Sequence, residues 1–197
     1  MSGEPRFHRT SALLVVDVQN DFADPAGSLF VPGGDRVATK VATLMRRAAA
    51  MKALVVCTQD WHPAVTPHFR EFGGVWPRHC VEGTWGAELH PLLPKPVAIV
   101  HKGEDQDDGY SGFGVRHLAT GEIAPTDLAP LLSRGGVSEV FVVGLALDVC
   151  VRATALDAVV AGFQTSLVTD ATSAVDLQEG DGRRALVELA AAGVTIV

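Results

Sequence analysis

The chain has 197 residues, 47% hydrophobic and 20% charged, a composition typical of a globular protein with a buried core, and we expect one domain over residues 1–197. The net charge of −7 and the lack of a Lys/Arg stripe argue against nucleic acid and anionic membranes as partners. No apolar run reaches the ~18 residues of a membrane span. Residues 1–9 lack the apolar stretch of a signal peptide, which predicts the cytoplasm.

Short apolar strands alternate with helices along the chain. In chain order we predict strand 12–16, helix 35–51, strand 53–58, strand 97–101, helix 127–133, strand 137–143, helix 149–163, strand 164–169, helix 179–192 and strand 194–197. Residues 60–96 form a long proline-rich loop of the kind that often carries function. The alternation predicts an α/β fold of three layers, αβα, with a mostly parallel central sheet of about six strands.

Four ionisable residues stand where predicted strands end, at Asp17, Asp60, Lys102 and Cys150. Ligands of open α/β sheets lie at the carboxyl ends of the strands, so we expect these side chains to meet there. Cys150 also begins a helix, whose dipole favours a thiolate. A nucleophilic cysteine needs a base and a neighbouring cation, which Asp17 and Lys102 can supply. A salt-bridge network without catalysis, with Cys150 as a core residue, is the alternative.

The long loop contains a second set of polar residues. An Asp-x-His pair is followed by two further histidines, giving Asp60, His62, His68 and His79. One carboxylate and three imidazoles suit a single divalent ion of zinc, iron or manganese. The alternative is that the histidines are solvated surface residues. The three cysteines form no CxxC pair and are odd in number, which argues against a zinc finger and a disulfide framework, and we interpret Cys80 as structural.

Three motifs together resemble those of the isochorismatase-like cysteine hydrolases, in the same order and over nearly the whole chain. They are Asp-Val-Gln-Asn-Asp-Phe at 17–22, His-Lys-Gly at 101–103 and Gly-Leu-Ala-Leu-Asp-Val-Cys-Val at 144–151. The resemblance implies that fold, with a catalytic triad of Asp17, Lys102 and Cys150. It also implies a cis peptide between Leu145 and Ala146, and an oxyanion hole formed by the N–H groups of Ala146 and Cys150.

The metal-ligand pattern and the segment Trp-Pro-Arg-His-Cys-Val-Glu-Gly-Thr at 76–84 are similar to the nicotinamidase branch of that family. This resemblance implies hydrolysis of nicotinamide, and of pyrazinamide, to the acid and ammonia, with a role in NAD salvage. A metal ion then holds the pyridine nitrogen, directly or close by. Phe22 and Trp76 are expected to sandwich the ring, and Leu145, Ala146 and Tyr110 to line the pocket.

Two rival functions stay open: a hydrolase of another small amide or ether, and a non-catalytic binding module of the same fold. The complete triad favours an enzyme. The Ala-rich helices fit either a homo-oligomer interface or ordinary core packing. The acidic loop 104–109 either disfavours anionic substrates or is simply solvated, and we expect it to be solvated.

Overall fold

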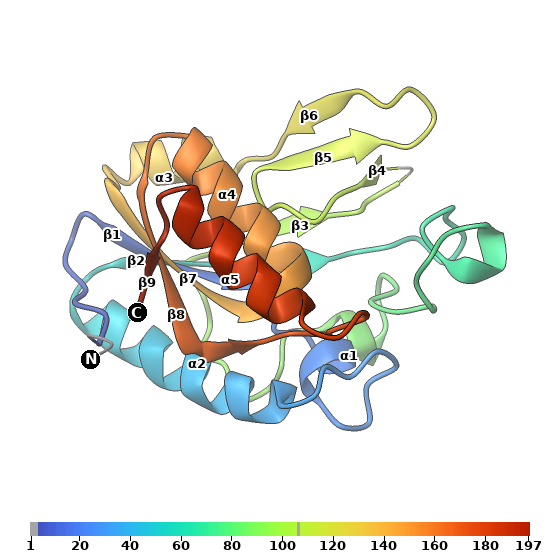
Figure 1. Cartoon of the computed structure of the whole chain (residues 1–197), viewed down its shortest axis with the longest axis horizontal. Helices are drawn as coiled ribbons and strands as arrows, with labels where there is room; N and C mark the ends of the chain where they lie inside the picture. Colours follow the sequence, from blue (N-terminus) through green and yellow to red (C-terminus); the bar gives the residue numbers. More distant parts are fainter. Residues whose placement is uncertain (1–3, 106) are drawn as a thin grey trace.

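The computed structural model describes residues 4–105 and 107–197, and its centre is a six-stranded sheet with the order β3-β2-β1-β7-β8-β9 (Figure 1). Every pair of adjacent strands is parallel. The strands are β1 (Ser11–Val16), β2 (Leu54–Asp60), β3 (Ala98–Lys102), β7 (Glu139–Leu145), β8 (Gln164–Ser173) and β9 (Thr195–Ile196). This sheet, flanked by helices, confirms the predicted α/β architecture.

Helices cover both faces of the sheet, as three layers require. The helix α2 (Gly34–Ala50) covers one face, and α3 (Leu128–Arg134), α4 (Arg152–Val160) and α5 (Asp181–Ala191) cover the other (Figure 1). Because successive side chains of a strand point to opposite faces, β1 contributes to both sides. Leu13 and Val15 face α2, whereas Leu14 faces the other three helices.

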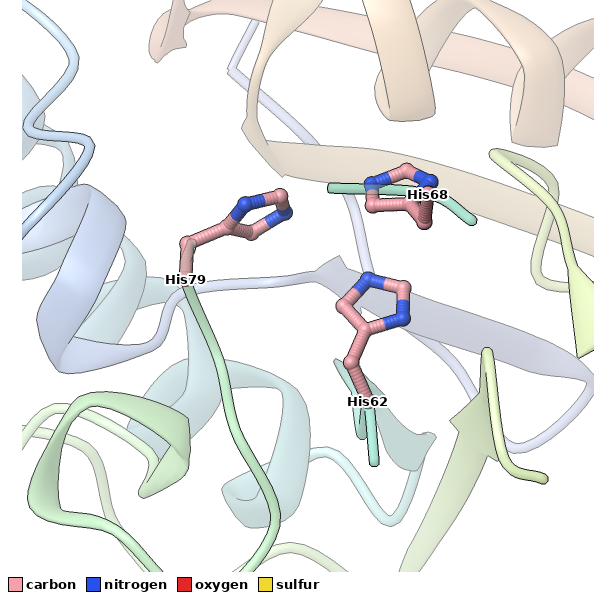
Figure 2. Close-up of side chains that lie close together, drawn as sticks. All are labelled: His62, His68 and His79. Carbon is pink, nitrogen blue, oxygen red and sulfur yellow. The ribbon is translucent and has the colours of Figure 1, made fainter. Parts of the chain in front are cut away.

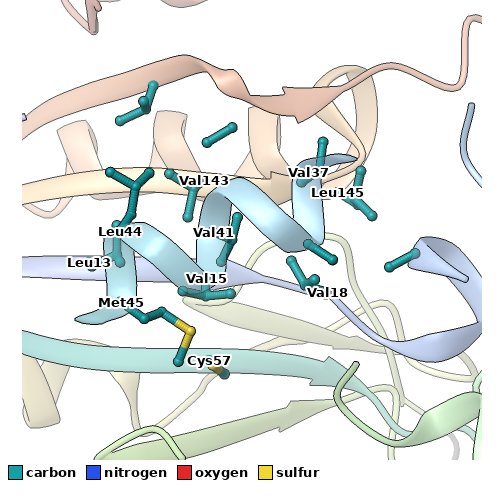
Figure 3. Packing of buried hydrophobic residues seen from close by; sticks show 14 of the residues in the cluster. Leu13, Val15, Val18, Val37, Val41, Leu44, Met45, Cys57, Val143 and Leu145 are labelled. Atoms are coloured by element: carbon teal, nitrogen blue, oxygen red, sulfur yellow. The ribbon is translucent and has the colours of Figure 1, made fainter. Parts of the chain in front are cut away.

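The sheet therefore separates two hydrophobic clusters. The α2-side core packs Val37, Val41 and Leu44 of α2 onto Val15 and Val143 of the sheet (Figure 3). The α3–α5-side core packs residues of the three other helices onto the opposite face of the same strands, with Leu128, Leu132, Ala155, Ala158, Ala185 and Leu189 among its members. Alanines of α4 and α5 thus serve the core, and the oligomeric state stays a prediction.

A small antiparallel sheet lies beyond β3 and was not predicted. Its strands are β4 (Asp107–Asp108), β5 (Gly114–His117) and β6 (Ile123–Pro125), in the order β4-β5-β6. Strands of two to four residues are too short to show an alternating pattern in sequence. Three further short elements also escaped prediction: α1 (Asn20–Ala23) and the 3₁₀ turns Arg70–Phe72 and Trp85–Ala87.

The chain differs from the predicted boundaries at two places that matter for function. Strand β2 continues to Asp60 rather than ending at Thr58, so Asp60 belongs to the sheet. The segment that holds Cys150 is a single π-helical turn, Leu147–Val151, and α4 begins only at Arg152. Within the described residues, every helix is too short or too polar to cross a bilayer.

Candidate functional site

The three predicted catalytic residues meet at the carboxyl edge of the central sheet. Asp17 follows β1, Lys102 ends β3, and Cys150 lies in the π-helical turn after β7. The Lys102 Nζ lies 2.7 Å from Asp17 Oδ2 and 3.5 Å from Cys150 Sγ. All three side chains are buried, so their charges interact through protein rather than through water.

The position of Asp17 depends on its neighbours in β2 and β7. Thr58 Oγ1 donates a 2.6 Å hydrogen bond to Asp17 Oδ1, which fixes the carboxylate. Gly144 packs against the last residue of β1 with a φ of +115°, and a Cβ there would lie 2.0 Å from the carbonyl oxygen of Val16. Only glycine fits this close approach, which brings β7 and its following turn beside Asp17.

Burial and the shared ammonium set the protonation of the triad. Burial favours the neutral amine, but the carboxylates of Asp17 and Asp60 outweigh it and raise the pKa of Lys102 well above its ordinary value. Burial raises the pKa of Asp17, and the opposing effect of Lys102 does not cancel it. Burial also raises the pKa of the Cys150 thiol well above 9.0. The helical position of Cys150 favours a thiolate, and burial opposes it.

Lys102 also contacts Asp60, a contact that joins the triad to the predicted metal ligands. The register of β2 and β3 places Asp60 opposite Lys102, and their side chains form an ion pair. Burial raises the pKa of Asp60, but Lys102 together with His79 and His62 outweighs this effect and holds that pKa well below its usual range. Gln19 binds the Asp60 backbone twice: its Nε2 donates to the carbonyl oxygen at 2.7 Å, and its Oε1 accepts from the amide at 2.9 Å.

The three predicted histidine ligands converge on one point. His62, His68 and His79 come from separate parts of the long loop, and each offers a nitrogen within 4.8 Å of the others (Figure 2). The Nε2 atoms of His62 and His79 lie 3.9 and 3.8 Å from Asp60 Oδ2. The structure therefore brings the three histidines together and places Asp60 beside two of them.

The chemistry of this cluster fits a divalent cation. Both ring nitrogens of His62 are buried and, within the described residues, neither has a hydrogen-bond partner. Burial lowers the pKa of His62 to about 4, so its ring is neutral at pH 7 and keeps a free lone pair. A Cβ at Gly103 would lie 2.6 Å from His62 Nδ1, so the ring occupies space that only glycine leaves open. A metal ion bound here would satisfy nitrogens that otherwise have no partner.

The acidic loop is not solvated throughout, contrary to expectation. Glu104 and Asp105 are exposed, and Gln106 lies outside the described residues. Asp108, however, turns inward: its side chain is 17% exposed, and its Oδ1 lies 2.9 Å from His68 Nδ1. The solvated interpretation is wrong at this position because β4 pairs with β5 and directs the carboxylate inward.

A small cavity opens beside Cys150. The predicted substrate residues that line it are Phe22, Trp76, Tyr110, Leu145 and Ala146. Trp76 Nε1 donates a 3.0 Å hydrogen bond to Tyr110 Oη, which links two of these walls. Four lining residues were missed, since nothing distinguishes them in sequence from other apolar positions: Leu29, Val31, Val149 and Val175.

Comparison with known proteins agrees with this geometry. Residues 11–197 match the isochorismatase domain. The chain belongs to the isochorismatase family. It is 37% identical to the nicotinamidase of Escherichia coli K12, over 94% of this chain and 93% of that one. Two similar solved structures are the pyrazinamidase of Pyrococcus horikoshii in complex with zinc (TM-score 0.85, 44% identity, 95% and 98% of the two chains) and PnC1 from L. infantum in complex with nicotinate (TM-score 0.87, 37% identity, 97% and 94%).

The peptide between Leu145 and Ala146 is cis, as the resemblance to the isochorismatase-like hydrolases implied. Ala146 lines the cavity together with Cys150. Among the described residues, the Ala146 amide donates no hydrogen bond to another backbone group. Its N–H group therefore keeps its donor capacity beside the predicted nucleophile.

A further residue of the first family motif organises the long loop. Asp21 accepts hydrogen bonds from the amides of Cys80, at 2.7 Å, and Ser28, at 2.9 Å. A Cβ at Gly86 would lie 2.1 Å from Asp21 Oδ2, so the turn that contains Gly86 packs directly on this carboxylate. Asp21 lies within a motif that the sequence shows, but we did not predict that it holds the segment next to His79.

Proposed function

We propose that this protein is a metal-dependent cysteine amidohydrolase that converts nicotinamide to nicotinate and ammonia, and also accepts pyrazinamide. The observation that carries the proposal is the contact of Lys102 with Asp17 and Cys150 beside a small cavity with aromatic walls. The nicotinamidases and pyrazinamidase to which the chain is similar support the choice of substrate. Cytoplasmic location and a role in NAD salvage stay predictions.

The reaction begins with proton transfer from Cys150 to Asp17. The raised pKa of Asp17 makes its carboxylate a stronger base, whereas the raised pKa of Cys150 opposes the transfer, and the Lys102 ammonium stabilises the resulting thiolate. The thiolate attacks the amide carbon and forms a carbon–sulfur bond. The carbonyl oxygen becomes an oxyanion, which the N–H groups of Ala146 and Cys150 stabilise.

The second half of the reaction releases both products. Asp17 returns its proton to the amide nitrogen as the carbon–nitrogen bond breaks, and ammonia leaves a thioester on Cys150. Asp17, ionised again, then takes a proton from water as the water oxygen attacks the thioester. The carbon–sulfur bond breaks, the acid leaves and loses its own proton to solvent as nicotinate, and the proton held by Asp17 returns to the Cys150 thiolate. Asp17 thus acts as base and acid in turn.

The metal group belongs to substrate binding in this proposal. Asp60, His62, His68 and His79 would hold one ion of zinc, iron or manganese. Such an ion is a Lewis acid that can bind and polarise a heteroatom of the substrate. The nitrogens of His62, which have no hydrogen-bond partner among residues 4–105 and 107–197, support its presence.

The shape and polarity of the cavity favour a flat, neutral substrate. Phe22 and Trp76 both line it, and aromatic faces suit the stacking of a pyridine ring. The described residues that line it include no lysine or arginine, and among them the proposed metal ligands are the polar groups that would meet a heteroatom of the substrate.

The decisive experiment measures ammonia released from nicotinamide by zinc-loaded protein. Cys150→Ala should release none, whereas Cys57→Ala, which removes another buried thiol, should retain activity. Release at the wild-type rate by Cys150→Ala would refute the mechanism. No release by wild-type protein that holds stoichiometric metal would refute the substrate and direct the search to other small amides.

The metal assignment has its own test. His62→Ala should bind less than one equivalent of metal and show a raised KM or no activity, because the variant removes the most buried ligand. Metal content measured by atomic spectrometry and KM measured on the same sample decide the question. Full activity in a metal-free His62→Ala sample would remove the metal from the scheme.

A further inference from the structure

We propose that Asp108 is a positioning residue that orients His68 as a metal ligand; the inference rests on the metal site of the proposed function. Its Oδ1 lies 2.9 Å from His68 Nδ1, within hydrogen-bond distance. His68 is 5% exposed on its side chain and Asp108 17%, so water competes little for this contact. Asp108 belongs to none of the family motifs from which the site residues were predicted.

The contact selects one state of the imidazole. A carboxylate accepts a hydrogen bond, so the proton of the neutral ring resides on Nδ1. The lone pair is then on Nε2, which is free to bind a cation. Where a metal-binding histidine donates its other N–H to a carboxylate, the carboxylate fixes the tautomer and the ring plane, and it makes the ligand nitrogen more basic.

The three histidines differ in the hydrogen-bond partner of their Nδ1 atoms. His79 Nδ1 lies 2.7 Å from the carbonyl oxygen of Pro77, which is a neutral partner. In the described part of the chain, His62 Nδ1 has no partner. His68 therefore receives an anionic partner, and Asp108 adds a negative charge close to the cation site without being a ligand itself.

The small antiparallel sheet holds the carboxylate in place. Asp108 pairs with Arg116 in the β4–β5 ladder, and its Oδ1 also accepts a 2.8 Å hydrogen bond from the Gly109 amide. A Cβ at Gly109 would lie 2.9 Å from the carbonyl oxygen of Gly114, so the chain turns tightly directly after Asp108. The small sheet thus connects the segment after Lys102 to the metal site, a role that its sequence did not indicate.

The test measures zinc affinity by competition with a chromogenic chelator, for wild-type protein and three variants. Asp108→Ala should bind zinc about 10- to 100-fold more weakly than wild type. Asp108→Asn keeps an acceptor but loses the charge, and should show a smaller loss. Asp107→Ala removes the neighbouring carboxylate, which points to the other face of β4, and should bind as wild type does.

The unfolding temperature of each variant in EDTA separates positioning from folding. A positioning role predicts that Asp108→Asn unfolds near the wild-type temperature without metal yet binds zinc more weakly. Wild-type zinc affinity in both Asp108 variants, or an equal loss in Asp107→Ala, would overturn the inference while leaving the proposed function intact. Wild-type protein that binds no zinc would overturn the metal site and this inference together, whereas zinc binding without ammonia release would fault the substrate alone.

Discussion

Lys102 is expected to be the largest single electrostatic contribution to the stability of this protein. It is 1% exposed and forms ion pairs with both Asp17 and Asp60. Lys102→Met keeps much of the side-chain volume but leaves two buried carboxylates without a cation. Removing one partner of a buried ion pair costs about 3–5 kcal/mol. At about 2–4 °C per kcal/mol for a chain of this size, the unfolding temperature should fall by roughly 6–20 °C.

The pKa shifts also predict how the stability of the variant changes with pH. The pKa of Lys102 is raised, so its contribution is complete below the ordinary value of 10.5 and is lost only as pH rises through the raised value. The pKa of Asp60 is lowered, so its contribution is complete above 3.8 and is lost as pH falls. In Lys102→Met the cation no longer opposes burial, so the pKa values of both carboxylates rise relative to those in the wild-type protein. The variant should therefore regain stability as pH falls and these groups take up protons.

The assay is urea unfolding of metal-free protein in EDTA, at about pH 8 and again at about pH 5. Lys40→Met is the matched control, because Lys40 forms an exposed ion pair with Asp170 at 2.5 Å. The free energy of unfolding of Lys40→Met should fall by less than about 1 kcal/mol at both pH values. A loss of the same small size in Lys102→Met, or one that does not shrink at the lower pH, would refute the electrostatic reasoning.

Three further predictions test separate parts of the site. Gly144→Ala places a Cβ 2.0 Å from the Val16 carbonyl oxygen and should lower the free energy of unfolding by roughly 2–4 kcal/mol in urea titrations; a change below about 0.5 kcal/mol would contradict the close contact. Burial raises the pKa of Asp17, which must be ionised to accept the thiol proton. With zinc saturating, kcat/KM for nicotinamide should therefore fall as pH drops through a pKa above 3.8, and a flat profile would exclude Asp17 as the base. Trp76→Phe and Tyr110→Phe each remove the same hydrogen bond and should each lower kcat/KM by about 2- to 12-fold. The double variant should be no worse than either single one, and additive losses would show that the bond is irrelevant.

The positions of the triad could be predicted because each residue lies at or after the carboxyl end of a predicted strand. Asp17 and Lys102 end strands of one parallel sheet, and the carboxyl ends of such strands lie along the same edge. The order of strands within the sheet cannot be read from a sequence of alternating elements. For this reason the pairing of Lys102 with Asp60, which depends on β2 and β3 being neighbours, was not foreseen.

Other features depend on tertiary context that a local pattern does not contain. The run around Cys150 predicts a helix, but whether its first turn is α or π depends on packing against the sheet edge. Asp108 lies in a run of charged residues that resembles solvated surface, and only the pairing of β4 with β5 turns it toward His68. Four apolar residues of the cavity wall were not predicted, because they are of the same residue types as those at ordinary core positions.

The two sides of the hydrophobic interior contribute differently to the reaction centre. Cys150 packs within the α3–α5-side core, whereas Phe22, Leu145 and Ala146 belong to the α2-side core. Because the sheet stands between them, a substitution on one side leaves the packing of the other largely unchanged. Repacking around α2 would reshape the wall that meets the substrate while the sulfur atom keeps its place. Substrate preference can therefore diverge among descendants of one ancestor without loss of the nucleophile.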